Sequence, residues 1–227
     1  WLRSYISFGP DRPRWAFVVD ALINKNVSKS GPKVHEECKI NILLQTWQAN
    51  LYQQTSLPSE ISRMFEIGKK YGLRITAPQP SVELKEQLPI WYPIGQAPGK
   101  RRLYTSRECQ CLRTKHNIST AGDARALTRI LDNPRHKPRR NCSCNDCWLV
   151  RHETHCENPH KCADEAEKLL DNLDPKWDPR ASHHAVQPLT RRERRHNERA
   201  EKTGGPIIFD PSYEVQRTLA DNFRIFT

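Results

Sequence analysis

The sequence predicts a mainly α-helical protein with little β-structure, and three observations lead to this class. Apolar residues recur at helical spacing in several segments of residues 1–95. The 17 prolines among 227 residues break the rest of the chain into short pieces and extended connections. Five of the eight cysteines gather between Asn141 and Cys162. We therefore expect a small helical N-terminal domain followed by a proline-rich C-terminal region that bound zinc stabilises.

Three helices are predicted in the N-terminal part. The first follows Pro13, a residue that suits the first helical turn because the N–H it lacks has no partner there. The second covers residues 40–47, and the third runs from the N-cap Ser59 to Gly72. Their predicted buried faces are Trp15, Val18, Val19, Leu22 and Ile23; Ile40, Leu43, Leu44 and Trp47; and Ile61, Met64, Phe65 and Tyr71. We interpret these side chains as core packing.

The middle of the chain alternates basic connections with short helices. Residues 95–110 are predicted to form a basic loop. Thr120 and Asp123 then match the capping box at the start of a helix. An extended basic linker at residues 133–140 leads to the clustered cysteines, and another helix covers residues 163–173. The predicted buried positions are Leu127, Ile130 and Leu131 in the first helix and Ala166, Leu169, Leu170 and Leu173 in the second.

The C-terminal part begins with a second capping box, Thr190 with Glu193, followed by a helix rich in arginine. This helix is polar on all faces, so it is either solvated or held by a partner. A strand, a helix and a strand are predicted after Gly204. We divide the chain into a helical domain (1–95), a basic linker with a short helix (96–141), a zinc-binding cysteine region with its helix (142–180), and an Arg-rich helix with a C-terminal tail (181–227).

The segment between residues 141 and 162, NCSCNDCWLVRHETHCENPHKC, concentrates metal-ligand side chains. Two residues separate Cys144 from Cys147, a spacing that lets both thiolates reach one tetrahedral zinc ion. The run C-x8-C-x5-C from Cys147 has the spacing of the first three ligands of CCCH-type zinc fingers, but Ala166 stands where their histidine would be. We predict one structural zinc held by Cys144, Cys147, Cys156 and Cys162, with Cys142 or His155 as the substitute.

Other interpretations of the cysteines stay open. Disulfides are typical of small secreted domains, and no signal peptide is recognisable at the start; because residue 1 is Trp, the chain can also be a piece of a longer protein. At least one of the five clustered thiols is spare if one zinc takes four ligands. A second metal site at Cys109, Cys111 and His116 would lack a fourth ligand, so we favour a buried thiol beside a polar histidine there.

A net charge of +11 favours a polyanionic partner, and beside a zinc cluster it predicts contact with nucleic acid, RNA or DNA. Trp148 is either a platform on which bases stack or a lid over the zinc sulfurs. The Arg-rich helix is either a phosphate-contacting arm or a solvated helix. The predicted nucleic-acid-binding residues are Arg135, Lys137, Arg139, Arg140, Trp148, Arg151, Arg191, Arg192, Arg194 and Arg195.

Catalytic signatures are missing from the sequence. It contains no phosphate-binding G-x-x-x-x-G-K-[ST] loop, no dinucleotide-binding G-x-G-x-x-G, no G-x-S-x-G elbow and no H-E-x-x-H metalloprotease helix. A zinc ion with four protein ligands has no open position for water. No apolar run approaches the length that crosses a bilayer. We therefore expect a protein that is not an enzyme and has no membrane partner.

Four landmarks stand in order along the chain: WLRSYISFGPDRPRWAFVVDALI; LPIWYPIG; the block from CLRTKHNISTAGD through CSCNDC and CENPHKCADEAEKLL to PKWDPR; and LTRRERRHNERAEKTGGPIIFDPS with LADNFRIFT. This layout resembles a cysteine-bearing region of fungal non-LTR retrotransposon polyproteins, which accompanies reverse transcriptase and ribonuclease H domains. The resemblance implies nucleic-acid partners, other domains of a parent polyprotein, and a nuclear or cytoplasmic location. The rival interpretation is a zinc-stabilised structural or protein-interaction module.

Overall fold

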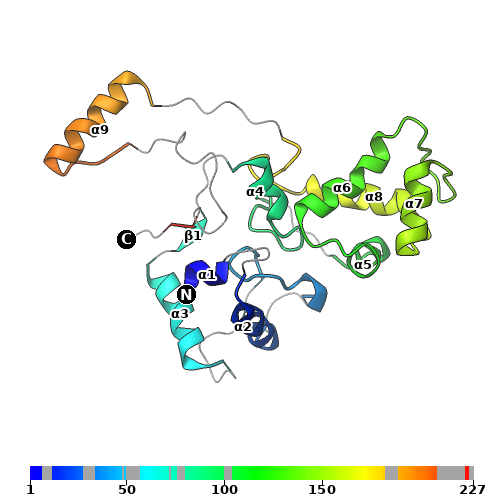
Figure 1. Ribbon diagram of the computed structural model, residues 1–227, viewed down its shortest axis with the longest axis horizontal. Helices are drawn as coiled ribbons and strands as arrows, with labels where there is room; N and C mark the ends of the chain where they lie inside the picture. Colours follow the sequence, from blue (N-terminus) through cyan, green and yellow to red (C-terminus); the bar gives the residue numbers. More distant parts are fainter. Residues whose placement is uncertain are drawn as a thin grey trace.

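The computed structural model describes residues 1–6, 12–27, 34–47, 49, 57–71, 73–75, 80–99, 104–181, 189–208 and 223–224. Within these residues the protein is mainly helical, as the sequence predicts, and its two strands have two residues each (Figure 1). The strands are β1 (Arg74–Ile75) and β2 (Phe223–Arg224), which pair antiparallel. The cysteines of the C-terminal half lie in clusters compatible with a zinc-binding region.

The N-terminal part contains α1 (Leu2–Ile6), α2 (Arg14–Lys25), the 3₁₀ helix η1 (Glu36–Cys38) and α3 (Ser59–Lys70). The prediction of α2 after Pro13 is confirmed, but Val18 is 60% exposed. The buried face of α2 is instead Ala16, Val19 and Ile23. Helix α3 begins at Ser59 itself, with Pro58 as its N-cap, and buries Met64 and Phe65 as predicted.

The predicted helix at 40–47 is wrong. The buried amide of Gln45 accepts hydrogen bonds from the backbone N–H groups of Ile40 and Asn41 at 2.9 and 3.1 Å. It also donates to the carbonyl oxygens of Cys38 and Trp91 at 2.6 and 2.7 Å. These bonds satisfy the backbone of a folded loop in place of the i to i−4 ladder. The prediction used only the spacing of the apolar residues, which does not register the hydrogen bonds of the polar Gln45. Apolar periodicity alone therefore could not exclude this loop.

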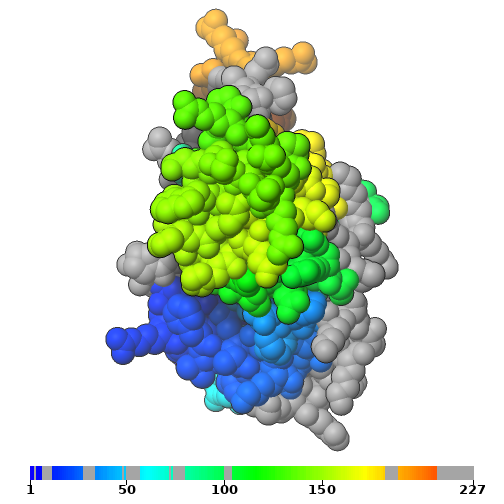
Figure 2. All heavy atoms as spheres, turned by 90° about the vertical axis from the view of Figure 1, so that its right-hand side faces the viewer, coloured from blue at the N-terminus to red at the C-terminus, as the bar shows by residue number. Residues whose placement is uncertain are grey.

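Helices α5 to α8 lie in the right-hand half of Figure 1, and α4 lies near its centre. Helices α6 and α8 pack along each other, with α5 and α7 against the N-terminal part of α8. Figure 2 shows these helices, in green to yellow, above the N-terminal helices in blue. Their bounds are α4 (Val82–Gln87), α5 (Arg107–Thr114), α6 (Ala121–Asp132), α7 (Asn145–Thr154) and α8 (Pro159–Leu170).

Helix α5 replaces part of the loop predicted at 95–110, and α7 was not predicted at all. Ser106 begins α5, since its side chain accepts a hydrogen bond from the N–H of Cys109 at 3.0 Å. The capping box of Thr120 and Asp123 is confirmed at the start of α6. The predicted buried side of the helix after Cys162 is also confirmed, although α8 begins earlier, at Pro159 with Asn158 as its N-cap.

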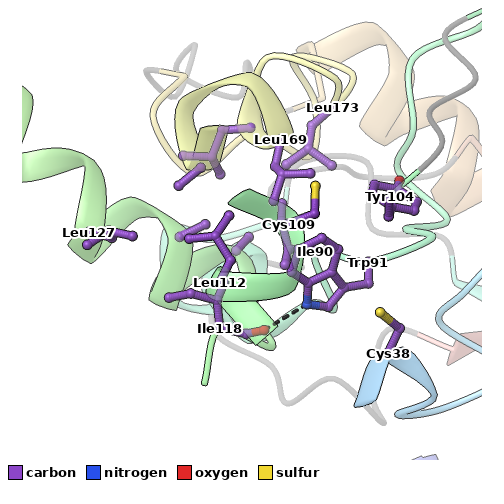
Figure 3. Packing of buried hydrophobic residues seen from close by; sticks show 14 of the residues in the cluster. Cys38, Ile90, Trp91, Tyr104, Cys109, Leu112, Ile118, Leu127, Leu169 and Leu173 are labelled. Carbon is purple, nitrogen blue, oxygen red and sulfur yellow. Dashed lines mark hydrogen bonds between the residues drawn. The ribbon is translucent and has the colours of Figure 1, made fainter. Parts of the chain in front are cut away.

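A continuous buried cluster joins these helices to the N-terminal part (Figure 3). At its centre Trp91 is fully buried and donates from Nε1 to the carbonyl oxygen of Ile118 at 2.7 Å. Tyr104 meets the Trp91 ring edge-on, with centroids 5.4 Å apart. Leu112 of α5 and Leu169 of α8 are buried in the same cluster. The core therefore draws side chains from both sides of residue 95, and it supports the helices that carry the clustered cysteines.

Helix α9 (Arg191–Thr203) lies apart from the other helices in Figure 1. Its predicted capping box, Thr190 with Glu193, is confirmed, and it ends at Gly204, which has a left-handed φ of 70°. Ala200 is the buried residue among those of the helix. Residues 209–222 lie outside the described residues, so the predicted C-terminal helix is not placed. In the part of the chain that the structure describes, no helix has both the length and the apolar character that a membrane span requires.

Candidate metal centres

The described residues bring cysteines and histidines together in two groups that could hold a metal ion. In each group, one ligand atom from every member lies within 4.8 Å of the others. We call Cys111, His116, Cys156 and Cys162 the long-range group, and His136, Cys142, Cys144 and Cys147 the local group. Each therefore offers three thiols and one imidazole. The four cysteines predicted to form a single site, Cys144, Cys147, Cys156 and Cys162, are divided between these two groups.

The local group is built around the ring of His136. Its Nδ1 lies 3.6 Å from the sulfur of Cys142, 3.7 Å from that of Cys144 and 3.4 Å from that of Cys147. The three cysteines are buried and His136 is half-buried. One nitrogen thus faces three sulfurs at similar distances, as expected for four ligands around a common centre.

The chain reaches this arrangement through a short turn and the start of α7. Cys144 is the N-cap of α7 and accepts a hydrogen bond from the N–H of Cys147 through its side chain. Because a thiol is a weak acceptor, this cap was not recognised in the sequence. Arg151 of α7 donates to the carbonyl oxygens of Arg140 and Cys142 at 2.9 and 2.6 Å. Helix α7 therefore holds the loop from both its first and its last turn.

The long-range group joins the end of α5 to the start of α8. Cys111 lies in α5, His116 follows that helix, Cys156 lies between α7 and α8, and Cys162 is the fourth residue of α8, at the end of its first turn. The sulfur of Cys156 is 3.8 Å from that of Cys111 and 3.6 Å from that of Cys162. Two segments that are distant in the sequence therefore supply two ligands each.

A buried ring nitrogen of His116 is an independent indication that the long-range group fits a metal ion. This nitrogen, Nε2, is buried and has no hydrogen-bond partner among the described residues. Burying a polar nitrogen without a partner costs about 1–3 kcal/mol. A metal ion bound at this group would satisfy that nitrogen, so the residues present fit a metal at this position.

The electrostatics of the thiols also fit a cation in each group. Hydrogen bonding with Cys162 lowers the pKa of Cys156 to about 4, while the same contact and burial raise the pKa of Cys162. Backbone hydrogen bonds from Cys144 and Lys137 lower the pKa of Cys142 to about 6, while burial raises the pKa of Cys147. Neighbouring thiols thus cannot all ionise together, whereas a divalent cation would replace their protons and stabilise every thiolate.

The distances match a tetrahedral metal. With Zn–S bonds of about 2.3 Å and Zn–N bonds of about 2.0–2.1 Å, neighbouring ligand atoms stand about 3.6–3.8 Å apart. Three such distances in the local group and two in the long-range group measure 3.4 to 3.8 Å, and all the ligand atoms of a group lie within 4.8 Å of one another. Each group also supplies the four ligands of a closed tetrahedral site.

His155 and Cys109, two candidates from the sequence, belong to neither group. His155 is the C-cap of α7, in the left-handed conformation with φ of 53°, and its carbonyl oxygen accepts from Lys115 at 2.8 Å. It therefore turns the chain toward Cys156. Cys109 instead lies 2.9 Å from the Glu165 carboxylate. Cys142, predicted as a substitute, is a member of the local group.

Sequence reasoning missed His136, which stands in the segment interpreted as a basic linker. The available signal was a histidine a few residues before Cys142. Cys111 and His116 were recognised as metal-ligand types, but their partners Cys156 and Cys162 lie far along the chain. No spacing rule connects such distant pairs.

The predicted nucleic-acid-binding residues divide by position. Arg135, Lys137, Arg139 and Arg140 are exposed around the local group, and Arg140 forms an ion pair with Glu157. Arg151 is half-buried, and its Nη2 bonds the carbonyl oxygens of the loop, so it has a structural role. Trp148 is 57% exposed, and its ring stacks on His152 with centroids 5.3 Å apart. In α9, the predicted nucleic-acid-binding arginines are all exposed; they are Arg191, Arg192, Arg194 and Arg195.

No family model matches the chain, and no curated protein or solved structure matches it significantly. The predicted resemblance to retrotransposon polyproteins therefore stays a prediction. What the chain does has to be argued from its own geometry, charge and ligand groups.

Proposed function

We propose that the chain is a non-catalytic nucleic-acid-binding region stabilised by two structural zinc ions. The observation that carries the proposal is the pair of four-ligand Cys and His groups in a chain of net charge +11. Three thiolates with one imidazole in tetrahedral arrangement favour zinc over metals that prefer oxygen ligands. Four protein ligands leave no open position for a substrate or an activated water, which favours a structural ion over a catalytic one.

The exposed basic residues near the two groups support a polyanionic partner. Arg135, Lys137 and Arg139 project from the connection between α6 and α7, which the local group closes. A surface cavity of about 410 Å³ borders the long-range group. Its charged lining comprises Arg107, Lys115, Arg140 and Lys161 together with Glu108 and Glu157. Backbone phosphates are the ligand class that such a basic surface would bind without reading sequence.

Trp148 supports unpaired bases as part of that ligand. Its exposed ring, already stacked on His152, offers a flat aromatic face beside the metal groups. Base stacking on an aromatic side chain contributes about 1–3 kcal/mol per base and tolerates any sequence. We therefore favour a single-stranded nucleic acid. Origin in a mobile-element polyprotein, as the sequence resemblance implies, is part of this proposal.

The test is binding of the intact protein to a fluorescent single-stranded oligonucleotide at several salt concentrations. Replacing Arg135, Lys137 and Arg139 by Gln should weaken binding and reduce the slope of log K against log salt by about 0.7 per lost phosphate contact. The matched control replaces three exposed basic residues of α3, namely Arg63, Lys69 and Lys70, by Gln. Trp148→Ala should weaken binding without changing the salt slope.

Two outcomes would contradict nucleic-acid binding at this surface. An equal loss in the α3 variant would show that only overall charge matters. No binding at low salt would favour the rival, a zinc-stabilised structural or protein-interaction module.

A further inference from the structure

The two metal groups are connected through a contact between two histidines. In the local group, Nδ1 of His136 faces the three sulfurs. The other ring nitrogen, Nε2, lies 3.1 Å from Nδ1 of His160. When Nδ1 of a neutral imidazole binds a metal, Nε2 carries the proton. Nε2–H of His136 then donates to His160, and this bond fixes both the tautomer and the ring orientation of the ligand.

His160 stands on the element that also serves the long-range group. It lies in the first turn of α8, two residues before Cys162. That turn is rigidly placed, because Asn158 caps it and Pro159 is buried. A shift of the first turn of α8 would therefore move a ligand of the long-range group and the hydrogen-bond partner of the local group together.

A second connection between the groups is weaker. Arg140, from the loop of the local group, pairs with Glu157, the neighbour of Cys156. The two side chains are 68% and 56% exposed. Exposed ion pairs contribute about 0–1 kcal/mol and are screened by salt. The half-buried contact of His136 with His160 bears directly on a metal ligand, so of these two contacts it is the one better placed to couple the groups.

We propose that His160 is a positioning residue that couples the two metal groups. The inference rests on both groups binding zinc, but it does not depend on nucleic-acid binding. Zinc in the long-range group fixes the start of α8 and so presents His160 to His136. Zinc in the local group orients His136 and so restrains the same turn. Because coupling between two binding sites is reciprocal, each ion strengthens the binding of the other.

The experiment measures both zinc constants of the intact, reduced protein by competition with a chromogenic chelator. Cys147→Ala should abolish zinc binding at the local group, and this loss identifies which of the two binding constants belongs to that group. His160→Ala should weaken that constant by about 10- to 100-fold, the usual effect of removing a partner of a metal-bound histidine. His160→Gln, which keeps an acceptor oxygen, should restore most of the loss. His152→Ala is the matched control, since His152 is a histidine of α7 outside both groups.

Coupling between the groups is measured as a change in the zinc-binding constant of the long-range group. This constant should weaken in Cys147→Ala and in His160→Ala, and the double variant should be no weaker than either alone. His160→Phe replaces His160→Ala if loss of the ring unfolds α8. Any one of three results would overturn the coupling. They are unchanged zinc-binding constants in the His160 variants, no recovery in His160→Gln, and a long-range constant that Cys147→Ala does not change. A wild-type protein that binds two zinc ions but no nucleic acid would leave this inference standing, whereas one that binds no zinc would remove its basis.

Discussion

The long-range and local groups have the same ligand types but connect different parts of the chain. The local group gathers four ligands from one short stretch, His136 to Cys147, around the start of α7. The long-range group joins two pairs of ligands that lie on opposite sides of that stretch, in the α5 region and around the start of α8. The local group therefore shapes a loop, while the long-range group fixes how α5 packs against α8.

This difference predicts unequal consequences when each ion is lost. A structural metal contributes its binding energy to folding. The local ion closes a single loop that Arg151 also holds, whereas the long-range ion joins α5 to α8, whose Leu112 and Leu169 are buried in the core. The long-range group should accordingly matter more for the stability of the whole region.

The largest effect is expected from Cys162→Ala. It should remove one zinc and lower the free energy of unfolding by more than about 4 kcal/mol, a range typical of losing a structural metal. Cys147→Ala should also remove one zinc but destabilise the protein less. Zinc content and chemical denaturation of the two variants make the comparison. A greater loss of stability in Cys147→Ala would reverse our assignment of roles.

The next largest effect is a difference in zinc content between variants of two nearby cysteines of α5. Cys111→Ala should remove the long-range zinc, since its sulfur lies 3.8 Å from that of Cys156. Cys109→Ala should leave both zinc ions in place, because Cys109 contacts the Glu165 carboxylate outside both groups. Metal analysis of the two purified variants is sufficient. Loss of zinc in Cys109→Ala would show that α5 presents its cysteines differently.

The local group was more accessible to sequence reasoning than the long-range group. Cys144 and Cys147 have a recognisable chelating spacing, and they do share a group. Cys156 and Cys162 follow at a spacing known from other zinc sites, and this spacing led to the prediction that they complete the same site, whereas the structure places them in the other group. Only the packing of α5 against α8 shows that their partners are Cys111 and His116. Metal ligands that lie within one short segment can thus be recognised from their spacing in the sequence, while the pairing of distant segments cannot.

The same distinction applies to the fold. The capping boxes of α6 and α9 are local side-chain patterns, and both were predicted correctly. The helix predicted at 40–47 failed because Gln45 bonds the distant carbonyl of Trp91. Helix α7 was missed because its N-cap is Cys144, a residue interpreted only as a metal ligand.

A smaller effect should follow from Arg151→Ala. This change removes the hydrogen bonds from α7 to the carbonyl oxygens of Arg140 and Cys142, and a hydrogen bond from a charged donor contributes about 1.5–3 kcal/mol. We expect zinc to leave the local group faster while release from the long-range group stays unchanged. Stopped-flow release to a chelator, with Arg107→Ala as the control, measures both rates. Equal acceleration at both groups would contradict a role confined to the local loop.

The smallest effect on stability is expected in α9. Replacing Arg191, Arg192, Arg194 and Arg195 by Gln should change the free energy of unfolding by no more than about 0.5 kcal/mol, because these side chains are exposed. Their proposed contribution is phosphate neutralisation, so the salt slope of nucleic-acid binding should fall instead. Thermal unfolding and a salt titration test both points. A large loss of stability would identify α9 as a packed element.

The central claim is that the cysteines form two separate metal centres, and metal content tests it most directly. Protein purified under reducing conditions should contain two zinc ions per chain, by elemental analysis and by native mass spectrometry. Cys142→Ala should reduce the content to one, as should Cys111→Ala, and the double variant should contain none. One zinc in the wild-type protein that persists in this double variant would support a single site of Cys144, Cys147, Cys156 and Cys162. That result, or a zinc-free protein with disulfides among these residues, would contradict the account.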